Sequence, residues 1–158
     1  MSVAFTKEND RDGTEANLQD RPISPHPNLV TPEGMAALEA ALAAAKVAVQ
    51  QALDAGEDAT GLALARASRD ARYYSARHAS AEIVAPPPAD GRVHFGSRVT
   101  FDRDDKRRQT FRIVGEDEAE PAEGTISYVS PVARALMGKE VGDVAVVGDG
   151  EVEIVAIG

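Results

Sequence analysis

Few side chains in this sequence are spaced for chemistry of their own. The absence of cysteine excludes disulfides and thiol-ligated zinc. Three histidines are scattered without metal-ligand spacing: His26, His78 and His94. Three carboxylates lie around a predicted turn: Asp54, Glu57 and Asp58. Acidic residues at such positions also serve as helix caps and interact favourably with the positive end of the helix dipole. The sequence therefore predicts no residue that is catalytic in isolation and no metal site of the protein's own.

Charge limits the function classes further. The net charge of −9 argues against a protein that coats nucleic acid, because such proteins need a basic field to displace counterions. An acidic protein docks on a basic partner or simply stays soluble. The predicted second helix carries a group of arginines, for which a solvated face is the default and contact with an anionic partner or RNA phosphate the alternative: Arg66, Arg69, Arg72 and Arg77. No apolar run approaches membrane-spanning length, and the first residues lack the order of a signal peptide.

Residues 31–84 predict a hairpin of two antiparallel helices. Thr31 can cap the first helix and Pro32 suits its first position, with Glu33 in the first turn. Apolar residues then follow at spacings of three and four, as in a heptad seam: Met35, Leu38, Leu42, Ala45, Val49 and Ala52. The second helix repeats this spacing: Leu64, Ala67, Ala71, Tyr74, His78 and Ala81. His78 is therefore expected to be a partly buried packing residue.

The flanking segments differ in composition. Residues 1–30 predict an extended or disordered arm, with a docking strand that includes Leu29 and Val30 as the alternative, helped by Ile23. Residues 85–91 predict a proline-rich linker. Alternating residues from position 92 onward predict a small twisted antiparallel sheet with one helix against it, built from these strands: 98–102, 109–114, 124–127, 143–147 and 151–157.

The stretch from Ile126 to Lys139 places a strand, a short helix and a glycine stop in fixed order. Ser130 is a good N-cap, and Pro131 suits the first helical position, where a missing N–H costs nothing. Gly138 is expected to close the helix.

These motifs resemble the Gre family of bacterial transcription elongation factors (GreA/GreB). The resemblance covers about residues 31–158, and its C-terminal elements occur in this order: Gly96 to Val99, Ile113 to Gly115 followed by acidic Glu116 to Ala119, Ile126-Ser127, Ser130-Pro131, Ala135 to Lys139, and Gly142-Asp143. Thr31, Gly34 and Leu38 resemble the start of the family's coiled coil. The resemblance implies an α+β fold, with an N-terminal antiparallel coiled-coil hairpin and a C-terminal FKBP-like antiparallel β domain with one short helix.

The resemblance also implies a partner, RNA polymerase. Gre-type factors hold the globular domain at the rim of the polymerase secondary channel and push the coiled coil into it. The implied polymerase-binding residues are Val129, Ser130, Pro131, Ala135, Leu136, Met137 and Lys139. Pro131 and Leu136 are expected to offer a rigid apolar surface, the alternative being that these residues merely cap and pack their helix. Val129 stands where some relatives carry an acidic residue.

In cleaving members of the family, acidic residues at the coiled-coil tip help to hold a Mg²⁺ of the polymerase active site. The corresponding residues here are Asp54, Glu57 and Asp58, which replace the family's usual tip motif only loosely. The family arm is about ten residues longer, so this arm is shorter by roughly 15 Å at 1.5 Å per helical residue. Two hypotheses follow: a transcript cleavage factor that shares the polymerase Mg²⁺, or a secondary-channel regulator that does not cleave.

Two other classes remain open, the first because the C-terminal domain resembles the FKBP fold. A prolyl isomerase needs an aromatic-lined pocket, and residues 92–158 contain only these aromatics: Phe95, Phe101, Phe111 and Tyr128. A coiled-coil interaction module with another partner is the second alternative. The favoured interpretation is a monomeric, cytoplasmic accessory factor of RNA polymerase, with indirect contact to nascent RNA, no membrane and no cofactor of its own.

Overall fold

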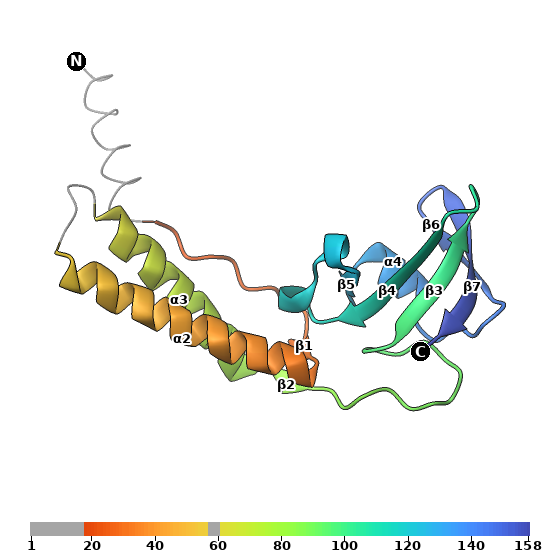
Figure 1. The fold of residues 1–158 in the computed structure, drawn as a ribbon, viewed down its shortest axis with the longest axis horizontal. Helices are drawn as coiled ribbons and strands as arrows, with labels where there is room; N and C mark the ends of the chain where they lie inside the picture. The colour runs from red at the N-terminus through yellow and green to blue at the C-terminus, as the bar shows by residue number, and fades with distance from the viewer. Residues whose placement is uncertain (1–17, 57–60) are drawn as a thin grey trace, which may run out of the picture. The chain divides into compact units, whose positions relative to one another are not determined.

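The computed structural model describes residues 18–56 and 61–158 (Figure 1). Within this part the chain divides into two compact units. One unit comprises the described residues up to Pro25 together with Leu38–Ser80, and the other comprises His26–Ala37 together with Ala81–Gly158. The first turn of the first helix thus packs with the C-terminal unit, whereas the rest of that helix belongs to the helical unit.

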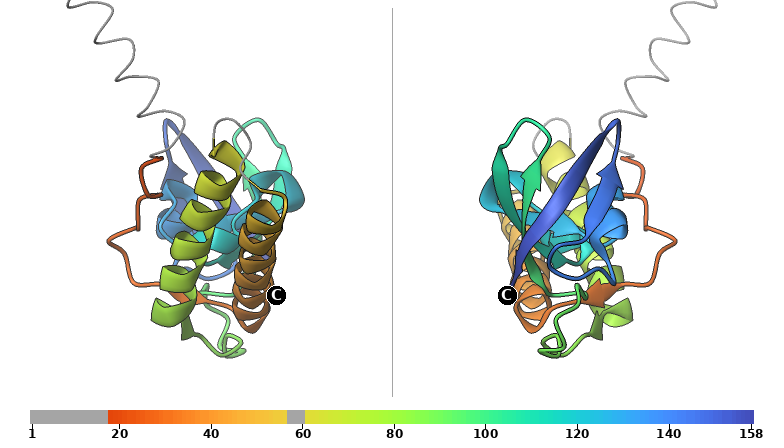
Figure 2. Two further views of the ribbon diagram at one scale, coloured as in Figure 1. Left: turned by 90° about the vertical axis from the view of Figure 1, so that its left-hand side faces the viewer. Right: turned by 90° about the vertical axis from the view of Figure 1, so that its right-hand side faces the viewer.

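The helical unit contains most of α2 (Pro32–Asp54) and all of α3 (Leu62–Ser80). The two helices lie side by side in every view (Figures 1 and 2). The predicted seam of α2 is confirmed, since Leu38 and Ala45 are buried and the other seam residues are half-buried. His78 of α3 is half-buried as expected, and its Nε2 lies 3.6 Å from Oε1 of Glu39.

The arginines of α3 do not form the uniformly solvated face that was the default expectation. Arg77 is only 2% exposed, while Arg66 is exposed. Arg72 forms an ion pair of 2.7 Å with Asp20, which belongs to the segment before the first strand. In that segment the Arg21 guanidinium lies 3.8 Å from the ring centroid of Tyr73. Residues 18–25 therefore contact α3 through paired charges and a cation–π interaction.

The C-terminal unit is built on a five-stranded sheet with the strand order β5-β4-β3-β7-β6. Its elements are β3 (Arg98–Arg103), β4 (Arg108–Val114), β5 (Thr125–Ser127), α4 (Pro131–Leu136), β6 (Val144–Val147) and β7 (Gly150–Ile157). Two 3₁₀ turns, η1 (Glu116–Glu118) and η2 (Pro121–Glu123), connect β4 to β5. The predicted β3–β4 hairpin is confirmed, with Thr100 opposite Thr110.

The expectation of a purely antiparallel sheet is wrong, because β5 pairs with β4 in parallel. A tight hairpin turn joins only antiparallel strands, whereas the two 3₁₀ turns between β4 and β5 form a crossover that brings the chain back in the same direction. The sheet is therefore mixed. Its core contains the following buried residues: Val93, Val99, Phe101, Ile113, Ile126, Ala133, Leu136, Ala145, Val152 and Ile154.

A separate parallel pair completes the C-terminal unit. β1 (Leu29–Val30) pairs with β2 (Glu82–Ile83). The alternative of a docking strand near the start of the chain is thus correct for Leu29 and Val30, of which Val30 is buried. Ile23 is half exposed and takes no part in this pair.

By length and composition α2 is apolar enough to cross a membrane, contrary to the expectation from the sequence. It is the one helix among the described residues that meets this test. Its apolarity comes largely from alanine, and its seam residues pack in the hairpin with α3. One such helix is weak evidence for a membrane span, because a packing helix in a soluble protein can meet the same test.

Candidate partner-docking site

Helix α4 follows a loop whose local bonds fix the helix start. The Ser130 hydroxyl accepts a hydrogen bond of 3.3 Å from the backbone N–H of Ala133, so the predicted N-cap is confirmed. Pro131 occupies the first helical position, also as predicted. After Leu136 the chain turns at Gly138, whose φ of +79° suits glycine and whose N–H donates to the carbonyl of Val93 at 2.8 Å. Both ends of this one-and-a-half-turn helix are thus held by hydrogen bonds.

The buried side of α4 is anchored in the core. Ala133 and Leu136 are both fully buried. Leu136 therefore packs against the sheet in this structure, and the expectation that it offers surface to a partner is corrected. The spacing of three residues between Ala133 and Leu136 places both on the one face that the sheet covers.

The remaining predicted docking residues reach the surface to different extents. Pro131 is exposed, and Met137 is 38% exposed. Four others are partly buried: Val129, Ser130, Ala135 and Lys139. Six of the seven predicted residues thus keep some accessible surface, as does the exposed Arg134, although Ala135 also packs against the core.

An aromatic pair, Phe95 and Tyr128, stabilises the loop before α4. The rings of Tyr128 and Phe95 meet edge to face, with centroids 5.6 Å apart. The Tyr128 hydroxyl donates to the carbonyl of Pro27. The Ser127 hydroxyl in turn accepts the N–H of Val129 at 3.2 Å. These contacts hold the loop without using the exposed side of Pro131.

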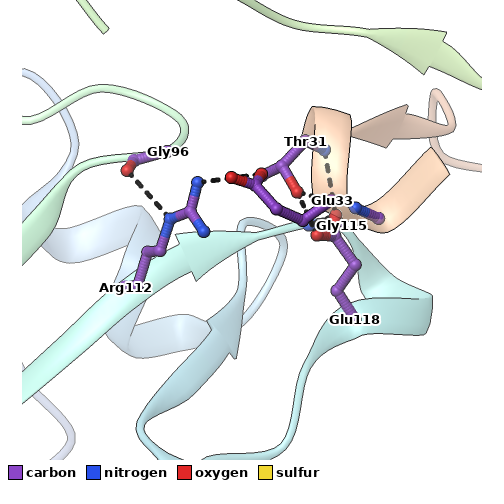
Figure 3. Close-up of polar contacts among 7 residues, drawn as sticks. Thr31, Glu33, Gly96, Arg112, Gly115 and Glu118 are labelled. Carbon is purple, nitrogen blue, oxygen red and sulfur yellow. Dashed lines mark hydrogen bonds and ion pairs between the residues drawn. The ribbon is translucent and has the colours of Figure 1, made fainter. Parts of the chain in front are cut away.

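A second cluster lies at the start of α2, within the same unit (Figure 3). The Glu118 carboxylate accepts hydrogen bonds from the backbone N–H of Thr31 at 3.0 Å, from the Thr31 hydroxyl, and from the N–H of Gly115 at 3.0 Å. The Thr31 oxygen also accepts the N–H of Gly34 at 3.0 Å, which confirms the predicted helix cap. We call Thr31, Gly34, Gly115 and Glu118 the Glu118 clamp.

Other atoms approach both glycines of the Glu118 clamp closely. A β-carbon at Gly34 would overlap the Glu118 carboxylate, and one at Gly115 would overlap the carbonyl oxygen of Leu29. The sequence predicts Thr31 as a helix cap, whereas Gly34 and the acidic run after Gly115 are recognisable there only as shared motifs. Their contact with Thr31 is not predictable from local patterns, because Thr31 and Glu118 are 87 positions apart and meet only through the tertiary fold.

An ion pair lies beside the Glu118 clamp. Arg112 on β4 contacts Glu33 at 3.4 Å, and its Nε donates to the carbonyl of Gly96 at 3.4 Å (Figure 3). The pKa of Glu33 is lowered from its usual value, first by the backbone N–H of Glu33 itself and then by the charge of Arg112. The Glu33 carboxylate in the first turn of α2 and the Glu118 clamp therefore both stabilise the start of this helix.

The predicted tip residues are only partly described. Asp54 is exposed at the end of α2, and its carboxylate accepts a hydrogen bond of 2.8 Å from the side chain of Gln50. Glu57 and Asp58 lie outside the described residues. Within residues 18–56 and 61–158, no group of three or more His, Cys, Asp or Glu side chains is arranged to hold a metal ion.

Comparison with known proteins decides the family. The model of the family "Transcription elongation factor, GreA/GreB, C-term" matches residues 88–158. The transcription elongation factor GreA of Ruegeria pomeroyi is 36% identical over 135 residues, which cover 72% of this chain and 83% of the relative. This chain belongs to the GreA/GreB family. GreA of Hyphomonas neptunium is likewise 36% identical, over 73% of this chain and 85% of the relative.

This GreA/GreB-family chain is a Gre-like transcription elongation factor. Both α4 and the Gly115 and Glu118 half of the Glu118 clamp lie within the residues that the family model matches. Among solved structures, GreA factor homolog 1 (Gfh1) of Thermus thermophilus is similar with a TM-score of 0.40 and 22% identity, over 84% of this chain and 99% of that chain. The transcription elongation factor GreA/GreB from Nitrosomonas europaea is similar with a TM-score of 0.38 and 24% identity, over 82% of this chain and 97% of that chain.

Proposed function

We propose that this Gre-like factor binds RNA polymerase in the cytoplasm through α4 and its preceding loop, and modulates elongation from the secondary channel. The observation that carries the proposal is that α4 combines a buried anchor with exposed apolar surface. Ala133 and Leu136 anchor the helix in the core, while Pro131 at its start and Met137 just after its end expose apolar surface. A short helix whose buried side chains already pack in the core needs no further ordering when a partner binds. Little conformational entropy is therefore lost on binding.

A binding experiment tests this contact. The double variant Pro131→Ala/Met137→Ser removes exposed apolar surface and leaves the Ser130 cap and the buried anchor in place. We expect it to weaken the affinity for RNA polymerase about 30-fold, since two small apolar contacts at about 1 kcal/mol each are lost and 1.4 kcal/mol corresponds to a factor of ten. Ile83→Ser is a matched control, because Ile83 is an apolar residue of β2, outside the hairpin and α4, that is 58% exposed. Equal loss of affinity in both variants, or in neither, would exclude α4 as the contact.

The second part of the proposal concerns the tip. Helix α2 ends at Asp54 after 23 residues, which corresponds to about 34 Å. A carboxylate ligates Mg²⁺ only within about 2.1 Å, so a tip that stops short contributes no ligand. The length of α2 favours a factor that binds the polymerase and modulates elongation without cleavage. The alternative is a factor whose tip carboxylates complete the coordination of a polymerase-bound Mg²⁺ and position water for cleavage of backtracked RNA.

Backtracked elongation complexes separate these two alternatives. A cleavage factor releases short 3′ RNA fragments from them, and a non-cleaving regulator releases none while it still changes the elongation rate. If fragments appear, the variant Asp54→Ala/Glu57→Ala/Asp58→Ala should abolish them and retain polymerase affinity. Under either outcome the polymerase breaks the bond, and this chain acts as an accessory factor.

A further inference from the structure

The sheet of the C-terminal unit has an unprotected edge at β6. This strand lies at the end of the strand order, and within the described residues no other strand pairs with its outer side (Figure 1). Two valines point away from the core along it, Val144 with 52% and Val146 with 68% of their surface exposed. Edge strands usually carry lysine, proline or a bulge that prevents pairing. β6 has no lysine or proline, and its exposed side chains are both β-branched and apolar.

The backbone of β6 is also oriented for pairing. The N–H of Ile154 donates to the carbonyl of Asp143 at 3.0 Å. Asp143 and Ile154 are thus a hydrogen-bonded pair. Because hydrogen-bonded and non-hydrogen-bonded pairs alternate in an antiparallel ladder, Val144 opposite Glu153 and Val146 opposite Glu151 are non-hydrogen-bonded pairs. The N–H and C=O groups of Val144 and Val146 therefore point away from β7. No other group among the described residues bonds to them, so they are available to an added strand.

The face around these valines is acidic. Glu153 lies directly opposite Val144 and Glu151 directly opposite Val146 on β7. Neither glutamate has an ion-pair partner among the described residues. A shallow hollow of about 440 Å³ opens here, lined by Val144, Val152, four carboxylates and two cations: Asp102, Asp104, Glu151 and Glu153, with Arg103 and Lys106. The Asp102 carboxylate is already bound by Arg108 at 2.7 Å, so three carboxylates face two cations in this hollow and its lining keeps a net negative charge.

We propose that β6 binds an extended basic segment of a partner protein, which adds to the sheet as a sixth strand. Neighbouring strands lie about 4.8 Å apart, so an added strand would lie about 9.6 Å from β7. A lysine or arginine on that strand spans this gap: its aliphatic stem covers Val144 or Val146, and its charged end meets Glu153 or Glu151. One basic side chain thus satisfies both features of the surface, the exposed valines and the unpaired carboxylates.

A second copy of this chain fits the edge less well. It would cover the valines but supply no cation for the glutamates, and each copy carries a net charge of −9. Like charges oppose association of this kind. Charge complementarity therefore selects a basic partner over self-association.

The experiment uses the full chain labelled with ¹⁵N and a seven-residue peptide of alternating lysine and valine, blocked at both ends. We expect the peptide to shift the amide signals of Val144 and Val146 and to slow their hydrogen exchange. A peptide of alternating glutamate and valine should leave both unchanged. Val146→Pro removes an N–H that faces the free edge, so the fold tolerates it while peptide binding is lost. Val146→Thr keeps this N–H and the branched shape, and retains binding.

A second variant tests the charge without touching the strand. Glu151→Gln/Glu153→Gln should weaken the lysine peptide about fivefold, as expected for two exposed charge pairs. Equal binding of the lysine and glutamate peptides, or no binding of either, would overturn the proposal. Concentration-dependent dimerisation that Val146→Pro abolishes would assign the edge to a second copy and would also overturn it. None of these outcomes depends on whether α4 binds RNA polymerase.

Discussion

From the geometry of the Glu118 clamp we predict that Gly34→Ala destabilises the protein when Glu118 is present. The same substitution should stabilise the protein when Glu118 is replaced by alanine. Gly34→Ala places a methyl group where the Glu118 carboxylate lies. The carboxylate must then give up its hydrogen bonds to the backbone N–H groups of Thr31 and Gly115. With Glu118→Ala alone, these two partly buried donors lose their acceptor but the space is empty.

The magnitudes follow from this geometry. Loss of the acceptor for two partly buried N–H groups should cost about 3 kcal/mol in Glu118→Ala. Gly34→Ala in the wild-type protein should destabilise by about 2 kcal/mol, because the lost hydrogen bonds outweigh the better helix propensity of alanine. Once Glu118→Ala has removed the carboxylate, Gly34→Ala should stabilise by about 0.5 to 1 kcal/mol. The coupling energy between the two positions is then more than 2 kcal/mol.

Urea unfolding of the four proteins of this double-mutant cycle, followed by the amide signals of β3, measures these free energies. Glu123→Ala is the matched control, since Glu123 is an exposed acid of the neighbouring 3₁₀ turn η2 and should change the free energy of unfolding by less than about 0.5 kcal/mol. Additive effects within about 0.5 kcal/mol would refute the reasoning, because they would mean that Gly34 and Glu118 do not share this space.

Three further predictions concern the C-terminal unit. Ser130→Ala should lower the free energy of unfolding by about 1 kcal/mol, because the N–H of Ala133 loses its cap; thermal unfolding checks this. Leu136→Ala should cost about 3 kcal/mol in the same assay because it opens a cavity in the core, and a loss below about 1 kcal/mol would contradict its burial. Arg108→Gln should raise the pKa of Asp102, which the hydrogen bond from Arg108 now lowers, towards the ordinary aspartate value in a carboxyl NMR titration. Any stability from this pair is present above the ordinary aspartate pKa and is lost as the pH falls through the lowered one. An unchanged pKa would exclude the pair.

Much of the fold could be predicted because its signals are local. The Thr31 cap, the heptad spacing and the Ser130 cap with Pro131 each depend on residues within a few positions of one another. The parallel pairing of β4 with β5 could not be predicted in this way. Pairing direction depends on where the crossover through η1 and η2 returns the chain, and alternation of side chains is the same in parallel and antiparallel strands.

The docking face shows the same division between local and distant contacts. Residue types and order located the segment from Val129 to Lys139 and the start of its helix. They did not separate Leu136, which faces the core, from Met137, which is partly exposed, because that difference depends on which side of α4 the sheet covers. The burial of Arg77 was likewise missed, since charge alone favours a solvated position.

The sequence by itself determined the family, the helical hairpin and the capped helix α4 that is the candidate contact to RNA polymerase. Periodicity, caps and ordered motifs depend on residues that are close to one another in the sequence. Only the tertiary structure decided which residues meet at a distance. Glu118 reaches Thr31 across 87 positions, and the valines of β6 lie beside the glutamates of β7 at an edge with which no other strand pairs among the described residues. Contacts of this kind depend on the packing of the whole unit, which brings together side chains that no local pattern connects.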